Sequence, residues 1–216
     1  MAPRKESESG NALLVVLPGG NGSADFHPFV SRIHANSLAE DFALAQPVAK
    51  NWTPSQQIVW PTANNKVKKM KYTTEELIEA VIKDVGKKTK LDSKRIYVLA
   101  WSSGGPAAYA TLLQKDTSLT GAVLAMSVFK PNQLPKLENG QGRSFYILHS
   151  PNDRVCPFSM AKNASKMLSD VDVRNTLIEY RGGHGWNGDI FGNIEKGVVW
   201  LEESKEADVK ETAADK

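Results

Sequence analysis

Cysteine and long apolar runs are both nearly missing from this chain of 216 residues, which has the single cysteine Cys156. One cysteine excludes an internal disulfide and any metal site built from several cysteines, because each needs at least two sulfur atoms. The best apolar run, at 12–17, is only strand-sized, whereas a membrane-spanning helix needs about 20 residues. The sequence therefore predicts no membrane span.

An excess of charge of one sign is also missing. The 27 basic and 24 acidic residues leave a formal net charge of +3, which is too small to predict nucleic-acid binding. Two short lysine clusters, at 66–71 and 87–90, are interpreted as a solvated loop and a solvated helix end. Hydrophobic residues make up 41% and charged residues 24%, which excludes disordered and fibrous proteins and favours a soluble globular one.

Both ends of the chain are polar. Residues 1–10 lack the apolar core of a signal segment, which favours a cytoplasmic protein unless such a segment has been removed. The tail at 204–216 is charged and nearly free of large apolar residues. We expect flexible segments at 1–10 and 204–216 around one domain at 11–203, a length that suits a single core.

Short β-rich apolar runs alternate with longer amphipathic stretches between the two ends. This alternation is typical of a compact α/β fold with a mostly parallel sheet of about six strands and helices on both faces. The run at 96–100 is apolar throughout, which indicates a central strand buried on both faces. The predicted strands are 12–17, 57–60, 95–101, 121–128, 144–150 and 174–180, and the predicted helices are 28–42, 74–89, 106–115, 159–168 and 190–203.

The segment at 99–106 joins an apolar strand to a helix through serine and glycine. Its sequence, Leu-Ala-Trp-Ser-Ser-Gly-Gly-Pro, places Ser102 at the apex of a strand–turn–helix unit. Small residues at Ala100 and Gly104 suit the crowding of such a turn, although the short pattern alone also arises by chance. A serine hydroxyl is a weak nucleophile, so a catalytic Ser102 requires a base and an acid that orients the base.

Two later loops supply candidates for the acid and the base. Asp153 follows a buried strand at the carboxyl edge of the sheet, where open α/β folds bind ligands, and a turn aspartate is the alternative. His184 lies between two glycines, and of the four histidines it alone follows Asp153. The chain order Ser102, Asp153, His184 favours a catalytic triad over an ordinary loop histidine. Asp189 comes too soon after His184 to fit this order.

The glycine-rich turn at 17–22 follows the first predicted strand. It lacks both the Gly-x-Gly-x-x-Gly spacing and the Gly-Lys-Ser/Thr sequence of nucleotide-binding loops. Its position instead suits an oxyanion hole made by the backbone N–H groups of Gly20 and Ser103.

Other residues near these loops are candidates for a substrate pocket or a cofactor site. Trp101 and Trp186 flank the candidate nucleophile and base, with plain core packing as the alternative. Ser127, at the end of the fourth predicted strand, and Phe129, just after it, could also line the pocket. The histidines and Cys156 form no ligand-spaced cluster, so neither a metal nor an organic cofactor is expected, and Cys156 is interpreted as a buried thiol.

Four segments, 17–20, 100–105, 149–157 and 183–186, resemble motifs of the α/β-hydrolases. The resemblance is strongest to the small phospholipase/carboxylesterase-like branch, which grades into polyhydroxybutyrate-depolymerase-like and feruloyl-esterase-like enzymes. It implies a compact α/β-hydrolase fold without a cap domain. It also implies that Ser102 is the nucleophile, His184 the base and Asp153 the acid, with oxyanion amides at Gly20 and Ser103.

The sequence departs from the family pattern at three positions. Pro18, Ala100 and Ser150 stand where many members have histidine, glycine and glycine, and none of these changes removes a reacting atom. The implied activity is hydrolysis of small-molecule or polysaccharide-linked carboxylic esters through an acyl-enzyme. A thioesterase, a feruloyl or acetyl-sugar esterase, and a catalytically silent binding protein on the same fold are the alternatives.

Overall fold

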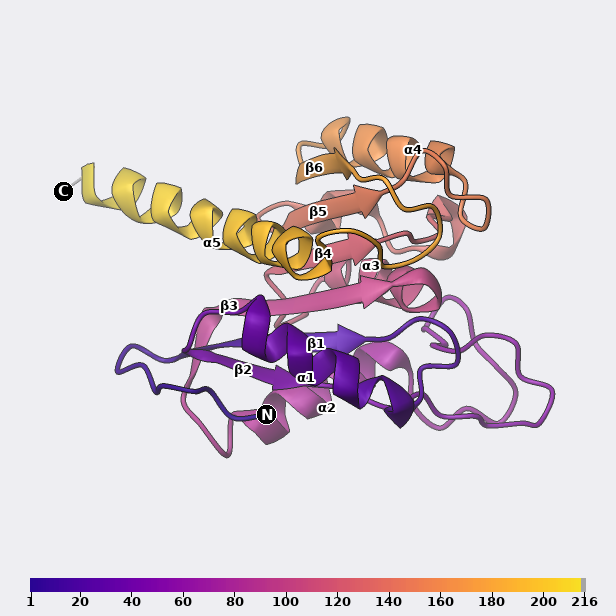
Figure 1. Ribbon diagram of the computed structural model, residues 1–216, viewed down its shortest axis with the longest axis horizontal. Coiled ribbons are helices and arrows are strands. Elements are labelled where there is room, and N and C mark those ends of the chain that lie inside the picture. Colours follow the sequence, from indigo (N-terminus) through magenta and orange to yellow (C-terminus); the bar gives the residue numbers. More distant parts are fainter. Residues whose placement is uncertain (215–216) are drawn as a thin grey trace.

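One parallel sheet organises the protein. The computed structural model describes the backbone of residues 1–214 and the side chains of residues 1–203. The six strands of this part follow the order β2-β1-β3-β4-β5-β6, and each neighbouring pair is parallel, so their carboxyl ends share one edge (Figure 1). The strands are β1 (Asn11–Leu17), β2 (Phe42–Ala45), β3 (Leu91–Trp101), β4 (Gly121–Ala125), β5 (Ser144–His149) and β6 (Arg174–Glu179).

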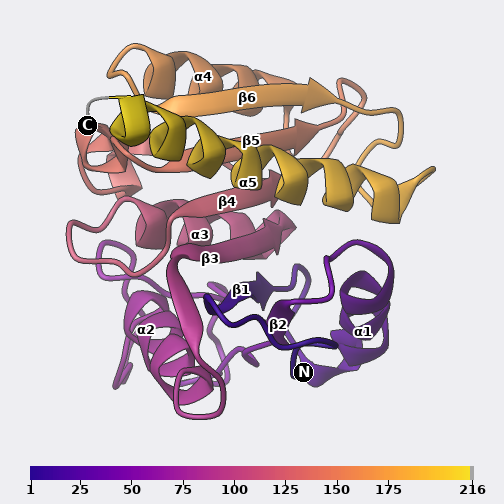
Figure 2. The same cartoon turned by 90° about the vertical axis from the view of Figure 1, so that its left-hand side faces the viewer.

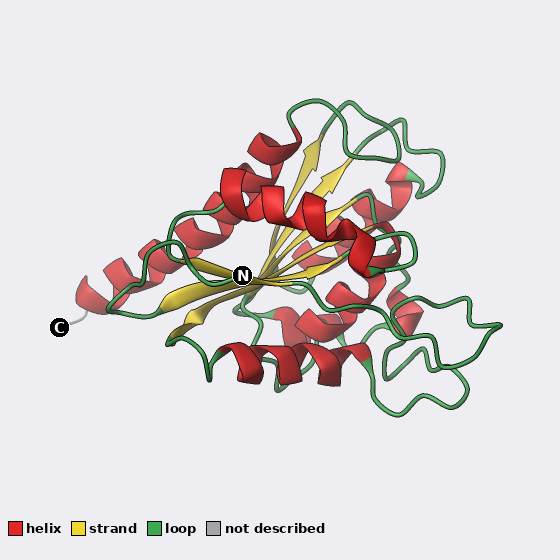
Figure 3. Ribbon diagram, turned by 60° about the horizontal axis from the view of Figure 1, so that its bottom comes forward, coloured by secondary structure: helices red, strands yellow, loops and turns green. Residues whose placement is uncertain are grey.

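Helices cover both faces of the sheet, as the sequence predicts (Figures 2 and 3). Helices α1 (His27–Asn36) and α5 (Ile190–Ala214) pack on one face. Helices α2 (Thr74–Val85), α3 (Gly105–Leu112) and α4 (Phe158–Ser169) pack on the other. Successive side chains of β3 enter the two cores alternately, because side chains along a strand point to opposite faces.

Strand β3 is the central strand that its apolar run predicts. It lies between β1 and β4, and its residues from Ile96 to Trp101 are at most 5% exposed. Burial on both faces explains why this stretch shows no alternation of polar and apolar residues. Burial of the strand holds its last residue, Trp101, in place, and the following turn begins directly after it.

The second strand differs from the prediction. Residues 57–60 form no strand, and the helix expected at 28–42 ends at Asn36, so that Phe42–Ala45 can form the edge strand β2. Trp60 is buried because it packs beneath the first turn, where its ring N–H donates to the Pro18 carbonyl at 2.9 Å. The apolar character of 57–60 thus reflects loop packing, and the four-residue β2 is too short to be distinguished from a helix end by periodicity.

The first residues of the chain contact the fold, and the last helix extends beyond its predicted end. The Met1 amino group donates to the Leu44 carbonyl at 2.7 Å, and Arg4 donates to the Leu38 carbonyl at 2.6 Å. Helix α5 continues past the predicted end at 203 to Ala214. Flexibility at 1–10 and 204–216 stays a prediction, and residues 215–216 lie outside the described residues. No helix of the described part is long and apolar enough to cross a membrane.

Helix α2 begins with a reciprocal cap formed by Thr73 and Glu76. The Thr73 hydroxyl accepts from the Glu76 N–H at 3.2 Å, and the Glu76 carboxylate accepts from the Thr73 N–H at 2.7 Å. We expect Thr73→Ala to lower the free energy of unfolding by about 1 kcal/mol, because the helix loses an acceptor for one of its free N–H groups. Urea denaturation measures this, with Thr73→Ser as the control that keeps the hydroxyl. Equal midpoints for both variants and the parent protein would contradict the role of the cap.

Candidate active site

Ser102 lies at the sharp turn between β3 and the short 3-10 helix η2 (Ser102–Gly104). Its φ is +50°, in the left-handed region that residues with a side chain rarely adopt. The surrounding packing enforces this conformation, since a Cβ at Gly104 would overlap the carbonyl oxygen of Leu17. The turn places the Ser102 hydroxyl at the carboxyl edge of the sheet.

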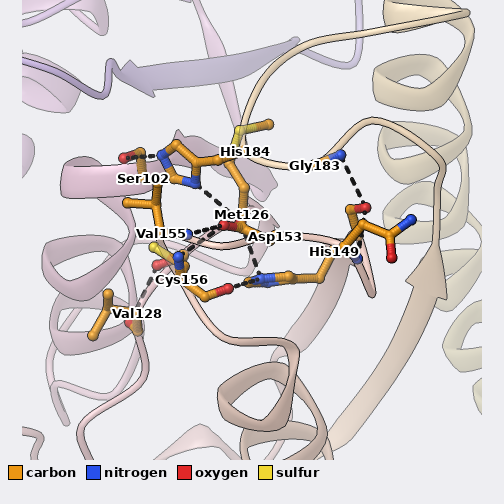
Figure 4. A network of polar contacts seen from close by, with 12 residues as sticks. Ser102, Met126, Val128, His149, Asp153, Val155, Cys156, Gly183 and His184 are labelled. Atoms are coloured by element: carbon orange, nitrogen blue, oxygen red, sulfur yellow. Dashed lines mark hydrogen bonds and ion pairs between the residues drawn. The ribbon is translucent and has the colours of Figure 1, made fainter.

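Three side chains from distant segments form one hydrogen-bonded chain (Figure 4). Ser102 Oγ lies 3.0 Å from His184 Nε2, and His184 Nδ1 lies 2.9 Å from Asp153 Oδ2. With the proton on Nδ1, His184 donates to Asp153 and leaves Nε2 free to accept the serine hydroxyl proton. The structure therefore brings together the three residues that the sequence selects as nucleophile, base and acid.

The Asp153 carboxylate is held by several donors. Its Oδ1 accepts the N–H groups of Val155 and Cys156, both at 2.8 Å, while Oδ2 accepts from His184. Burial raises the pKa of Asp153, and the hydrogen bonds from His184, Cys156 and Val155 lower it. The lowering is larger than the rise, so the pKa of Asp153 lies below its ordinary value. The side chain is fully buried and yet stays ionised, which suits it to stabilise a positively charged imidazole.

Ser150 links the loop that carries Asp153 to the loop that carries His184. Its buried Oγ accepts the Gly183 N–H at 3.0 Å. The Tyr180 hydroxyl donates to the carbonyls of both neighbours of His184, Gly183 at 3.1 Å and Gly185 at 2.8 Å. Burial raises the pKa of Tyr180 to about 12, so this hydroxyl keeps its proton. Sequence reasoning treated Ser150 only as a departure from the family pattern, although a polar residue ending a buried strand was a usable signal.

His149 is a second histidine that sequence reasoning missed. It is 1% exposed, and its Nε2 donates to the Cys156 carbonyl at 2.8 Å while lying 3.4 Å from Asp153 Oδ2. The contact with Cys156 closes the loop around the carboxylate. The signal in the sequence was a histidine inside an otherwise apolar strand.

Cys156 lies next to the acid but is not suited to be a nucleophile. It is 3% exposed, and burial together with the charge of Asp153 raises the pKa of its thiol to about 11. Ligand atoms of Asp153, Cys156 and His184 lie within 4.8 Å of one another. A metal ion at this point would have to displace the hydrogen bond between His184 and Asp153 and remove the thiol proton.

The two residues predicted for an oxyanion hole lie next to each other. Gly20 has a φ of +60°, and its carbonyl accepts the Ser103 hydroxyl at 2.9 Å. Ser103 is the second residue of η2, so its N–H has no acceptor within that helix. A Cβ at Gly19 would lie 2.7 Å from Trp101, which shows how closely the first turn approaches the serine turn. The role of these N–H groups toward an oxyanion stays a prediction.

The predicted pocket residues take part in packing. Trp101 is 5% exposed and packs edge-on against Phe26 and Trp186, with ring centroids 5.6 and 5.7 Å apart. Ser127 and Phe129 are also buried. None of Trp101, Ser127, Phe129 and Trp186 lines the cavity of about 330 Å³ that opens beside Ser103. Contact between these four residues and a substrate stays a prediction.

Known proteins resemble this chain in family and in fold. Residues 39–198 match the family model described as phospholipase/carboxylesterase. The chain is 17% identical to a carboxylesterase from Bacillus cereus, with a TM-score of 0.63, covering 94% of this chain and 92% of that chain. Esterase PE8 is 16% identical, with a TM-score of 0.67 and coverages of 94% and 95%. SOBER1 from Arabidopsis thaliana is 16% identical, with a TM-score of 0.64 and coverages of 88% and 99%. At these identities the solved structures show the fold alone, which is that of an α/β-hydrolase.

Gly105 tests how tightly the serine turn is packed. A Cβ at Gly105 would overlap the side chain of Ser127 on the neighbouring strand end. We expect Gly105→Ala to lower the free energy of unfolding by about 1–3 kcal/mol, because this overlap forces the turn or the strand end to shift. Combining it with Ser127→Gly should recover part of the loss, since the overlapping atoms are then absent. Thermal or urea denaturation of both single variants and the double variant measures this coupling, and strictly additive losses would contradict it.

Proposed function

The chain belongs to the phospholipase/carboxylesterase family of α/β-hydrolases, and from this premise we propose that it is a serine hydrolase of carboxylic esters. The hydrogen-bonded chain from Ser102 through His184 to Asp153 is the observation that carries the proposal. A nucleophile within reach of a base, which is itself oriented by a buried carboxylate, is the arrangement that acyl transfer requires.

The proposed reaction begins with attack of Ser102 Oγ on the ester carbonyl. His184 Nε2 takes the serine proton as the new bond forms, and Asp153 stabilises the resulting imidazolium. The N–H groups of Gly20 and Ser103 donate to the negative oxygen of the tetrahedral intermediate. The intermediate then collapses, and the alcohol leaves with the proton held by His184. Water, activated by His184 in the same way, hydrolyses the acyl-enzyme and releases the acid.

Replacement of the nucleophile is the direct test. We expect Ser102→Ala to lower the rate of p-nitrophenyl acetate hydrolysis by about 10⁴-fold or more, because no other group can form the acyl-enzyme. A fluorophosphonate probe should label the parent protein and leave the variant unlabelled, since only an activated serine reacts. The matched control is Ser159→Ala, an exposed serine in α4.

Either of two results would overturn the proposal. Hydrolysis by Ser102→Ala at the parental rate would remove Ser102 as nucleophile. A folded parent protein that neither hydrolyses esters nor reacts with the probe would point to a binding protein with a silent triad.

Replacement of the acid tests the orientation of the base. We expect Asp153→Asn to lower kcat by roughly 10³- to 10⁴-fold, because an amide holds the imidazole in the wrong tautomer and cannot offset its positive charge. Circular dichroism confirms that the variant is folded, and steady-state kinetics measure kcat. A loss below about tenfold in a folded variant would show that Asp153 does not serve His184.

A further inference from the structure

The cavity of about 330 Å³ opens immediately beside the proposed nucleophile. Ser103, in the turn that follows Ser102, and Pro106, in the first turn of α3, form part of its wall. The rest of the wall comes from α3 and from two connections, residues 57–65 and 128–134. Both connections lie beyond the carboxyl ends of the strands, and the first belongs to the long loop that extends past the sheet edge in Figure 1. The cavity thus begins one residue from Ser102.

The cavity wall carries a hydroxyl group without a partner. Tyr109 in α3 is 2% exposed and contributes to the wall. No hydrogen bond of its hydroxyl is found within the described residues, and edge-on packing of Phe129, with ring centroids 5.2 Å apart, fixes the ring. Burial raises the pKa of Tyr109 well above its ordinary value, so the group stays a neutral donor. An acceptor oxygen of a ligand in the cavity would give this hydroxyl a hydrogen-bond partner.

The charged residue of the cavity wall is basic. Lys130 is the one charged residue among the described residues of the wall, and it forms no ion pair there. The connection at 46–73 carries five lysines and no acidic residue, and the connection at 126–137 carries Lys130 and Lys136 and again no acidic residue. The formal net charge of the chain is only +3, so these two connections are more basic than the chain as a whole. Such a field attracts anions to the cavity mouth.

We propose that this cavity selects esters that carry a carboxylate on the part that enters it. Lys130 is the charge partner of that carboxylate, and the Tyr109 hydroxyl is a second donor to its oxygens. The volume of the cavity suits a short chain, since whole ligand pockets start at about 300 Å³. This specificity rests on the proposed function, because it concerns which esters Ser102 cleaves.

Two pairs of substrates, each matched in shape and differing in charge, test the proposal. The acyl pair is ethyl 5-carboxypentanoate and ethyl 5-carbamoylpentanoate, and the alcohol pair is 3-acetoxybenzoate and 3-acetoxybenzamide. We expect the parent protein to favour the anionic member of one pair by about tenfold in kcat/KM, through KM, and to lose part of this preference as salt is added.

Three variants locate the source of the preference. Lys130→Gln removes the charge and keeps most of the length of the side chain, so it should remove most of the preference by lowering kcat/KM much more for the anionic member than for the neutral one. Tyr109→Phe should lower kcat/KM more for the anionic member than for the neutral one. Lys136→Gln, an exposed lysine of the same connection, is the matched control and should keep the preference.

The outcomes separate this proposal from the proposed function. Equal kcat/KM for the charged and neutral members of both pairs, in a protein that hydrolyses p-nitrophenyl acetate, overturns the carboxylate specificity alone. Equal losses in Lys130→Gln and Lys136→Gln overturn the role of Lys130 in the cavity. Absence of both p-nitrophenyl acetate hydrolysis and fluorophosphonate labelling overturns the proposed function itself.

Discussion

The hydrogen bond between His184 and the buried carboxylate of Asp153 is the contact on which the site depends. Ionising a fully buried carboxyl group is unfavourable, and here three donors offset that cost. Two of these donors come from the backbone of the acid's own loop, so the loop must be folded before the carboxylate can orient the imidazole. Ser150 then joins that loop to the segment before His184. The positions of acid and base are therefore set together.

The parallel sheet makes this arrangement possible. Residues 102, 153 and 184 follow β3, β5 and β6, whose carboxyl ends share one edge, so side chains distant in the sequence meet without a long excursion of the chain. The tight packing of Gly104 and Gly105 keeps the serine turn against β1 and the end of β4. The same edge carries the lysine-rich connections at 46–73 and 126–137. One edge of the fold thus carries both the proposed reacting groups and the connections that form the cavity wall.

Much of the fold and the meeting of Ser102, Asp153 and His184 could be predicted from the sequence. Continuous apolar runs identify buried strands, and small residues around Ser102 indicate a crowded turn, because both are local consequences of packing. Strand β2 and the loop around Trp60 could not be predicted, since their structure depends on contacts with distant residues such as Pro18. The interactions of His149 and Ser150 depend on loops that are brought together only by the folded sheet. The cavity was missed for the same reason, because its wall combines separate connections.

The buried thiol beside the acid has a chemical consequence for the durability of the site. With a pKa of about 11, only about one Cys156 side chain in 10⁴ is a thiolate at neutral pH, and peroxides and electrophiles attack the thiolate. Oxidation to a bulky sulfinic or sulfonic acid would push apart the loop whose N–H groups hold Asp153. Because Cys156 stays a protonated thiol, oxidation is slow and the hydrogen bonds that hold the Asp153 carboxylate are preserved.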